Sequence, residues 1–282
     1  MISNTQDIRK SCICSTNTGY SNTKIIYDNK PIIFESKVSK YCDEDLRKTI
    51  LLNGERFAVG VGTNDLDMNK VTSQHQRIIV EYVLSKIPYD KVNMVVALPC
   101  DVYLNRKARE DYYNFIKGFD KVTDCLVYME GFASVFADLD YYTNDLRIVM
   151  DVGGKTINVL LVDKGKLVKG SAFSMNMGSI ILGNRIKKAL EQDRLCVMHE
   201  NQIKYMMNDN ITKSVLTAYS EEIKNELRKH DYPTGVQIRC AGGGAITYKD
   251  LFKEKFNADI SEDAILENAI GMYAVGLQYW GE

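Results

Sequence analysis

The sequence predicts an α/β protein made of two halves with a similar plan. Short apolar runs, typical of strands, alternate with longer runs whose apolar residues recur at helical spacing. A strand, a glycine turn and a returning strand follow one another from Asn17, and again from Asp151. This alternation predicts that helices pack against a sheet in each half.

In the first half, strand-like runs come first and helical runs follow. The run 72–86 has Ile78, Ile79 and Val83 at helical spacing, and the apolar run 92–98 stops at Pro99. We expect strands at 11–15, 24–27, 32–35, 56–61, 92–98 and 126–129, and helices at 72–86, 105–119 and 131–142.

The second half begins with strands and continues with helices. Residues 192–235 contain helical patterns and no strand-like run. We expect strands at 147–151, 156–163, 166–171 and 236–241, and helices at 179–192, 199–207, 212–229 and 262–280, with a short helix after residue 244.

Composition narrows the classes of function. A net charge of −1 gives no support for a nucleic-acid-binding or membrane-binding surface. No apolar run reaches the roughly 20 residues of a spanning helix, and the polar N-terminus does not resemble a signal peptide. The seven cysteines are scattered and the three histidines isolated, so we expect reduced thiols, no zinc-type site and a cytoplasmic protein.

Two glycine turns are the first candidates for chemistry. The first glycine turn, residues 17–24, reads NTGYSNTK, and the second, residues 151–158, reads DVGGKTIN. Each lies between two expected strands, where glycine lets several backbone N–H groups point into one concavity that suits phosphate oxygens. Lys24, on the returning strand, could reach a phosphate as a point charge. Most single glycine hairpins only reverse the chain, but two of them half a chain apart favour a phosphate clamp.

The glycine triplet, residues 242–244, lies between an expected strand and a helix. Here a planar ligand could lie on the backbone, with the helix N-terminus favouring a phosphate nearby. The alternative is a close contact between the strand and the helix. The sequence contains neither a GxGxxG motif of the Rossmann type nor a GxxxxGK[ST] P-loop.

Glu130 follows the strand 126–129 and precedes the expected helix from Gly131. A carboxylate at the C-terminal end of a strand faces the crevice where ligands bind in open α/β sheets, so it could orient a water for attack on a phosphoanhydride. The alternative is an acidic residue at a helix N-terminus, paired with the helix dipole.

Together these four elements resemble the signature of the actin superfamily. In chain order they are the first glycine turn, Glu130, the second glycine turn and the glycine triplet. Within it the chain is most similar to the ParM family of bacterial actin-like plasmid-segregation proteins and its smaller AlfA-like members. The stretches 52–60, 95–99 and 151–156 support a resemblance that covers nearly the whole chain.

The resemblance implies a duplicated, ribonuclease H-like α/β fold of two domains with a nucleotide cleft between them. The first domain would comprise residues 1–147, with a small insertion subdomain IB at about 31–75, and would be completed by a C-terminal helix at 262–282. The second would comprise 148–261. Subdomain IIB would be reduced or absent in it, because residues 192–235 leave no room for a further sheet.

The resemblance also implies the ligands, ATP or GTP with Mg²⁺, and a role for each matching residue. Glu130 would position the hydrolytic water, and Asp151 would hold Mg²⁺ through its water shell, with a weak contribution from Asn17. The phosphates would be bound by Asn17, Gly19, Tyr20, Ser21, Lys24, Gly153, Gly154, Lys155 and Thr156, and the adenosine by Gly242, Gly243 and Gly244.

Two positions depart from the family pattern. Asn17 stands where the family usually has Asp, which removes one negative charge from the metal site. Tyr20 stands where actin has a small hydroxyl residue, although Ser21 follows. We therefore expect nucleotide binding to persist, with slower hydrolysis or a differently held metal ion.

By resemblance, the function would be that of a nucleotide-driven filament, an ATPase or GTPase. It would move or position plasmid or similar DNA through a DNA-binding adaptor protein and contact neither DNA nor membrane itself. A sugar-kinase-type transferase is an alternative; it needs a carboxylate beside the γ-phosphate, for which Asp101 is the candidate. A cell-shape or division scaffold would need a membrane-binding end, which residues 1–10 do not provide, and an Hsp70-like chaperone would need a further peptide-binding domain.

Overall fold

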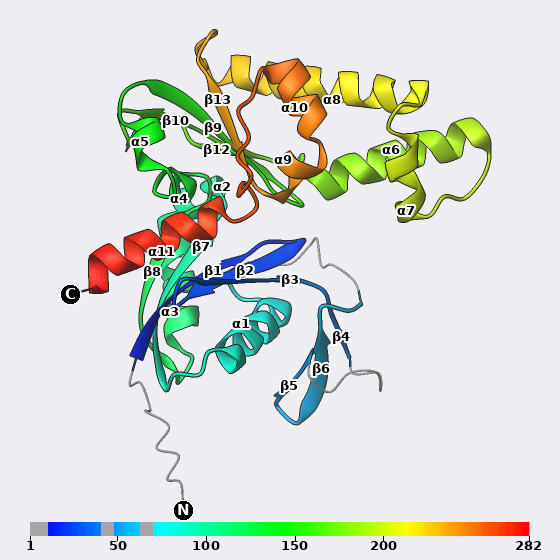
Figure 1. Ribbon diagram of the computed structural model, residues 1–282. Helices are drawn as coiled ribbons and strands as arrows, with labels where there is room; N and C mark the ends of the chain where they lie inside the picture. The colour runs from blue at the N-terminus through cyan, green and yellow to red at the C-terminus, as the bar shows by residue number, and fades with distance from the viewer. Residues whose placement is uncertain (1–10, 41–47, 63–69, 282) are drawn as a thin grey trace, which may run out of the picture. The chain divides into compact units, whose positions relative to one another are not determined.

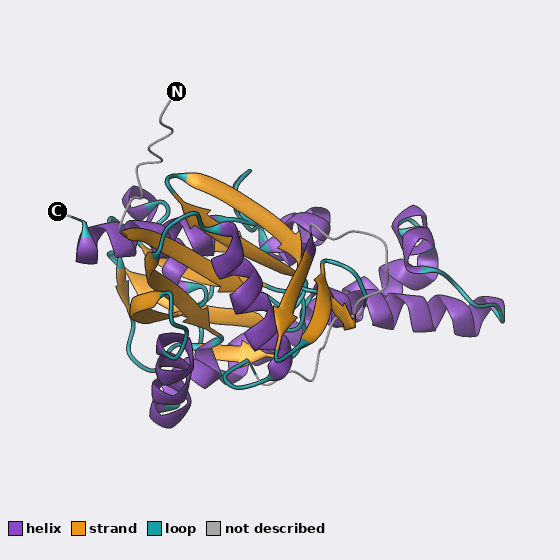
Figure 2. Ribbon diagram, turned by 90° about the horizontal axis from the view of Figure 1, so that it is seen from below, coloured by secondary structure: helices purple, strands orange, loops and turns teal. Residues whose placement is uncertain are grey.

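The computed structural model describes residues 11–40, 48–62 and 70–281 (Figures 1 and 2). The chain divides into two compact units. The first unit comprises Met1–Asp138 and Leu266–Glu282, and the second comprises Leu139–Ile265. Helices flank a mixed sheet in each unit, which confirms the predicted α/β class.

The sheet of the first unit has five strands in the order β3-β2-β1-β7-β8. Its first three strands are antiparallel neighbours, whereas β7 and β8 run parallel to β1. The strands are β1 (Ser11–Thr18), β2 (Asn22–Tyr27), β3 (Lys30–Glu35), β7 (Lys91–Leu98) and β8 (Val122–Met129).

Helices cover both faces of this sheet (Figure 1). They are α1 (Gln74–Lys86), α2 (Cys100–Leu104), α3 (Arg106–Lys117), α4 (Phe132–Val135) and α11 (Glu267–Trp280). Along β7, Met94 and Val96 join the core under α1 and α3, while Val95 and Ala97 join the core formed with α4 and α11. Successive side chains of a strand point to opposite faces of the sheet, so one run of apolar residues contributes to both cores.

A small three-stranded sheet, ordered β4-β6-β5, extends the first unit. Its strands are β4 (Val38–Lys40), β5 (Thr49–Leu52) and β6 (Glu55–Val59). Leu52 and Phe57 bury their side chains in the same core as α1. The sequence predicted only β6, because β4 and β5 are short.

The second unit has a sheet in the order β11-β10-β9-β13, with β12 also paired to β10. Its strands are β9 (Leu146–Val152), β10 (Ile157–Asp163), β11 (Lys166–Leu167), β12 (Phe173–Met175) and β13 (Ile238–Ala241). Its helices are α5 (Leu139–Tyr142), α6 (Ser179–Arg194), α7 (Glu200–Ile203), η2 (Lys204–Met206), α8 (Asn210–Lys229), α9 (Gly243–Thr247) and α10 (Lys249–Phe256).

The core of the second unit forms where α6 and α8 meet the sheet. Leu182, Ile186 and Leu190 recur every fourth residue along α6 and are fully buried. Tyr219 and Ile223 of α8 pack in the same cluster. The chain between α6 and β13 forms α7, η2 and α8, as its helical patterns predicted.

Three predicted elements are wrong in extent. The helix expected at 131–142 is two short helices, α4 and α5, because the chain passes from the first unit to the second after Asp138. The helix expected at 262–280 starts at Glu267, because Ala264 accepts a hydrogen bond from Gly242 N (2.7 Å) and is held in a turn. The strand expected at 166–171 ends at Leu167. No helix in the described part of the chain is long and apolar enough to cross a membrane.

Candidate functional site

The first glycine turn joins β1 to β2, as predicted. Gly19 N donates to the carbonyl of Asn22 (3.1 Å), and a Cβ at Gly19 would lie 2.8 Å from that oxygen. The same Cβ position is 3.3 Å from Lys24 Nζ, so the ammonium lies over the turn. Asn17 is the cross-strand partner of Lys24 and shares its face of the hairpin. The structure therefore brings three predicted phosphate-binding residues together, while Tyr20 and Ser21 are half-buried within the turn.

Asn17 contains an unsatisfied polar atom. Its Oδ1 is buried and has no hydrogen-bond partner. Burying an acceptor without a hydrogen-bond partner costs roughly 1–3 kcal/mol of folding free energy, so a buried Asn17 Oδ1 without a partner needs an explanation. It can accept a hydrogen bond from a ligand or from a water bound to a cation, which fits the weak metal role expected for Asn17.

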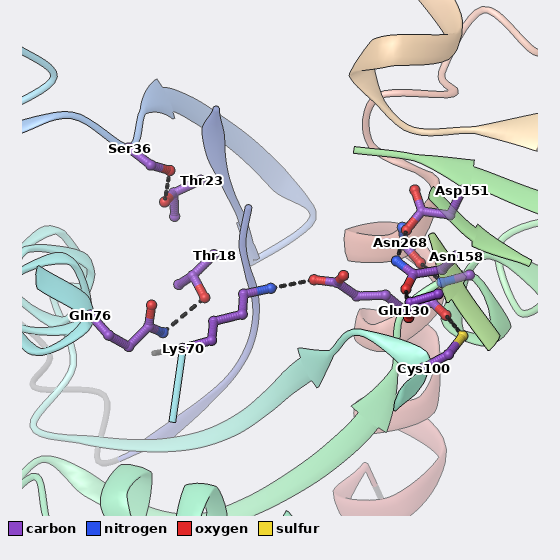
Figure 3. Close-up of polar contacts among 12 residues, drawn as sticks. Thr18, Thr23, Ser36, Lys70, Gln76, Cys100, Glu130, Asp151, Asn158 and Asn268 are labelled. Atoms are coloured by element: carbon purple, nitrogen blue, oxygen red, sulfur yellow. Dashed lines mark hydrogen bonds and ion pairs between the residues drawn. The ribbon is translucent and has the colours of Figure 1, made fainter. Parts of the chain in front are cut away.

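Glu130 directly follows β8, and its main chain is held on both sides. Its N–H donates to Leu98 O (2.8 Å), and the N–H of Gly131, at φ 77°, donates to Asn268 Oδ1 of α11 (2.9 Å). Gly131 is the N-cap of α4, so the alternative in which Glu130 caps that helix is not supported. Instead, the Glu130 carboxylate forms a buried ion pair with Lys70 (Figure 3).

Polar contacts also tie α1 to the strands beside the first glycine turn. Gln76 Nε2 donates to Thr18 Oγ1 (2.8 Å) and to the hydroxyl of Tyr112 (3.0 Å). The hydroxyls of Thr23 and Ser36 are 2.8 Å apart (Figure 3). These contacts were not predicted, since nothing in the sequence pairs residues so far apart along the chain.

The second glycine turn joins β9 to β10, as predicted, and is attached to the N-terminus of α6. Gly178 N donates to Lys155 O (2.7 Å), Ser179 N to Gly153 O (2.9 Å) and Ile180 N to Gly154 O (2.9 Å). A Cβ at Gly178 would lie 2.4 Å from the carbonyl carbon and oxygen of Gly154, so only glycine permits this approach.

These hydrogen bonds fix the direction of three peptide groups. In a trans peptide, the C=O of one residue and the N–H of the next point in opposite directions. Because the carbonyls of residues 153–155 face α6, the N–H groups of Gly154, Lys155 and Thr156 face away from it. Successive N–H groups aimed to one side form an anion-binding concavity.

Asp151 lies at the C-terminal end of β9 and is buried. Asn158, its cross-strand partner on β10, donates from Nδ2 to Asp151 Oδ2 (3.4 Å; Figure 3) and accepts at Oδ1 from the hydroxyl of Ser174 on β12 (2.8 Å). This row of side chains across three strands fixes the carboxylate at the edge of the second glycine turn.

The glycine triplet follows β13 and begins α9, as predicted, and it packs against the end of β9. A Cβ at Gly242 would lie 2.5 Å from Val152 O and 2.7 Å from Asp151 Oδ1. A Cβ at Gly244 would lie 2.6 Å from Val152 Cγ1. At Gly243 the nearest atoms are 3.6 Å away, so this glycine alone is not required for packing.

Residues 17–135 match the family model described as "Actin like proteins N terminal domain". The chain has an actin-like fold. A search of curated protein sequences finds no match.

Solved structures share the fold of this chain over almost its whole length. A 15-stranded ParM filament from Clostridium botulinum is 18% identical, with a TM-score of 0.77, covering 96% of this chain and 100% of that one. The Alp12 filament structure is 20% identical, with a TM-score of 0.68 and coverage of 96% and 99%. Ta0583, an archaeal actin homolog in complex with ADP, is 18% identical, with a TM-score of 0.71 and coverage of 94% and 99%.

The predicted site residues of this chain form one group in each unit. Asn17, Gly19 and Lys24 lie together in the first unit, which also holds Glu130. In the second unit, the glycine triplet approaches Asp151 beside the second glycine turn. The predicted nucleotide cleft between the domains stays a prediction.

Sequence reasoning missed three residues that shape these groups. Gly178 gave a signal, because a glycine directly before a helical run is a recognised N-cap position. Asn158 lies in the second glycine turn, but the sequence assigned it no role. Lys70 gave no signal, since it lies in a polar stretch that matches no motif.

Proposed function

We propose that this protein, which has an actin-like fold, binds a nucleoside triphosphate with Mg²⁺ and hydrolyses it. The observation that carries the proposal is the attachment of the second glycine turn to α6, which aims the N–H groups of Gly154, Lys155 and Thr156 away from the helix. These groups would bind phosphate oxygens, and the Lys24 ammonium over the first glycine turn would neutralise them. Gly242, Gly243 and Gly244 would contact the nucleoside.

Mg²⁺ fits the chemistry of the residues that we propose for cation binding. The described residues hold no cluster of three or more His, Cys, Asp or Glu side chains, so a cation would need ligands from the nucleotide and from water. Mg²⁺ binds in this way, through one or two carboxylates and phosphates while keeping several waters. Asp151 would accept hydrogen bonds from those waters, and the unsatisfied Asn17 Oδ1 would accept another. The bound ion would supply charge neutralisation of the phosphates.

Glu130 would orient the attacking water in this reaction. It is buried beside Lys70 at the end of β8, and both flanking peptide N–H groups are bonded. Removing a group that activates the nucleophile costs on the order of 10²–10⁴ in rate. With Asn17 in place of a carboxylate, hydrolysis would be slow while binding persists.

We further propose that the protein assembles with copies of itself into filaments in the cytoplasm. The similar fold of the ParM and Alp12 filaments supports self-association. By resemblance to the plasmid-segregating members, a DNA-binding adaptor would connect the filament to plasmid or similar DNA. The sugar-kinase alternative gains no support, since Asp101 is exposed in the first turn of α2.

Light scattering and pelleting with ATP·Mg²⁺, GTP·Mg²⁺, ADP or no nucleotide test assembly, and phosphate release tests hydrolysis. We expect assembly with a triphosphate and disassembly after hydrolysis. Glu130→Ala should assemble but release phosphate and disassemble more slowly. Absence of assembly under every condition would refute the filament, and normal turnover in Glu130→Ala would remove Glu130 from the mechanism.

A further inference from the structure

The ion pair between Lys70 and Glu130 is unusual for its burial. The two side chains are only 2% and 8% exposed. Lysine and glutamate are almost never buried to this extent unless paired, and a buried pair contributes little net stability because both ions lose their hydration. A need to hold one of the two charges in place explains the pair better than stability does.

Lys70 is carried by a main chain that is anchored beside the first glycine turn. It lies three residues before Ser73, the N-cap of α1. His75 Nε2 lies 2.7 Å from Ser36 O, and Gln76 binds Thr18 at the end of β1. The ammonium of Lys70 is 6.0 Å from the centre of the Tyr20 ring in the same turn. These contacts of α1 thus hold the start of the helix, and Lys70 just before it, close to the first glycine turn.

Hydrogen bonds fix the main chain of Glu130, and the contact with Lys70 helps to fix its side chain. The hydrogen bonds to Leu98 and Asn268 set its backbone, whereas the carboxylate can rotate about three side-chain bonds. Its contact with the Lys70 ammonium restricts that rotation. Loss of the ammonium would remove the cation that compensates the buried charge of Glu130, which favours another side-chain rotamer or uptake of a proton. Either change would alter the direction in which the carboxylate accepts a hydrogen bond.

We propose that Lys70 is the positioning residue for Glu130. It holds carboxylate oxygen Oε1, so that Glu130 presents an acceptor to the water in a constant direction. The inference rests on the proposed function, in which Glu130 orients the hydrolytic water. Lys70 itself transfers no proton and forms no bond in the reaction.

Phosphate release, normalised to the polymer that pellets, tests this in the full-length protein. A misplacement of about 1 Å at a reacting centre can cost on the order of 10²-fold in rate, so Lys70→Met should lower kcat by about that factor. KM and the affinity for ADP should stay unchanged, and Lys70→Arg should recover most of the rate. Lys40→Met, which removes a lysine from an exposed pair with Glu55 (3.2 Å), is the matched control and should behave as wild type.

A double-mutant cycle separates positioning from a general structural effect. In a Glu130→Gln background, Lys70→Met should cause no further loss of kcat, because the carboxylate that it positions is gone. Equal losses in the two backgrounds, or a wild-type kcat in Lys70→Met, would overturn the inference while leaving the proposed function intact. If Lys70→Met does not fold, Lys70→Gln is judged by the same criteria. Failure of the wild-type protein to hydrolyse ATP and GTP would refute the proposed hydrolysis, and the inference with it.

Discussion

Alanine substitutions at the three glycines of the triplet should affect stability to very different extents. Gly242 has φ 87° and ψ 161°, a region that is essentially restricted to glycine and costs other residues about 1–3 kcal/mol. The added Cβ would also lie 2.5 Å from Val152 O, an overpacking that costs about 1–3 kcal/mol more. Gly242→Ala should therefore lower the free energy of unfolding by about 2–6 kcal/mol.

Gly243 provides the matched control one residue later. Its added Cβ would meet only the Ile265 side chain at 3.6 Å, an ordinary contact. Because Gly243 begins α9, alanine should leave stability unchanged or raise it by up to about 1 kcal/mol. Gly244→Ala should resemble Gly242→Ala, since its Cβ would lie 2.6 Å from Val152 Cγ1.

Urea unfolding of the three variants measures these differences, and titration with ADP measures the proposed nucleoside contact. Gly243→Ala should fold normally but bind ADP more weakly if the nucleoside lies on this backbone. Equal destabilisation at Gly242 and Gly243 would refute the packing argument. Unchanged ADP affinity in Gly243→Ala would refute the nucleoside contact at that residue.

Substitutions at Gly178 and Asn17 and chemical labelling of Cys14 test three further features of the structure. Gly178→Ala should destabilise the protein by about 1–3 kcal/mol and weaken ADP binding, because its Cβ would collide with the second glycine turn. Gly183→Ala is the control within α6, the helix that Gly178 caps; its Cβ would lie 3.4 Å from the nearest atom, so melting and titration experiments should show neither effect. Asn17→Asp should speed phosphate release and lower the Mg²⁺ concentration that release requires, and no change in either would contradict a metal role. Burial raises the pKa of Cys14 to about 12, so this residue stays a protonated thiol at about pH 8. A thiol reagent should therefore label the exposed Cys196 much faster than Cys14. Rapid labelling of Cys14 would show that the core opens.

The elements that the sequence predicted well are those whose signals are local. A glycine flanked by two apolar strands places both glycine turns, and the buried period along α6 places its core face. The two helices predicted too long both cross a boundary between the units, after Asp138 and before Leu266. The helical spacing of apolar residues continues across these points. The spacing indicates that a segment can form a helix, but it does not indicate which of the two units the segment packs against.

The unpredicted part of the candidate site depends on contacts between distant segments. Lys70 and Glu130 are brought together by the packing of α1 against the sheet, which no local pattern encodes. The attachment of the second glycine turn to α6 was equally unpredicted, since backbone hydrogen bonds carry no side-chain signature.

Because the second glycine turn is hydrogen-bonded to the N-terminus of α6, a small movement of the turn would be transmitted along this helix. With 16 residues at 1.5 Å each, α6 is about 24 Å long. A tilt of about 5° at the turn would therefore move its far end by about 2 Å, according to the same helix geometry. That end leads into Leu195 and Val197, two of the most exposed apolar side chains described in this protein. A small rearrangement at the second glycine turn would thus cause a larger displacement at a surface where apolar side chains are exposed.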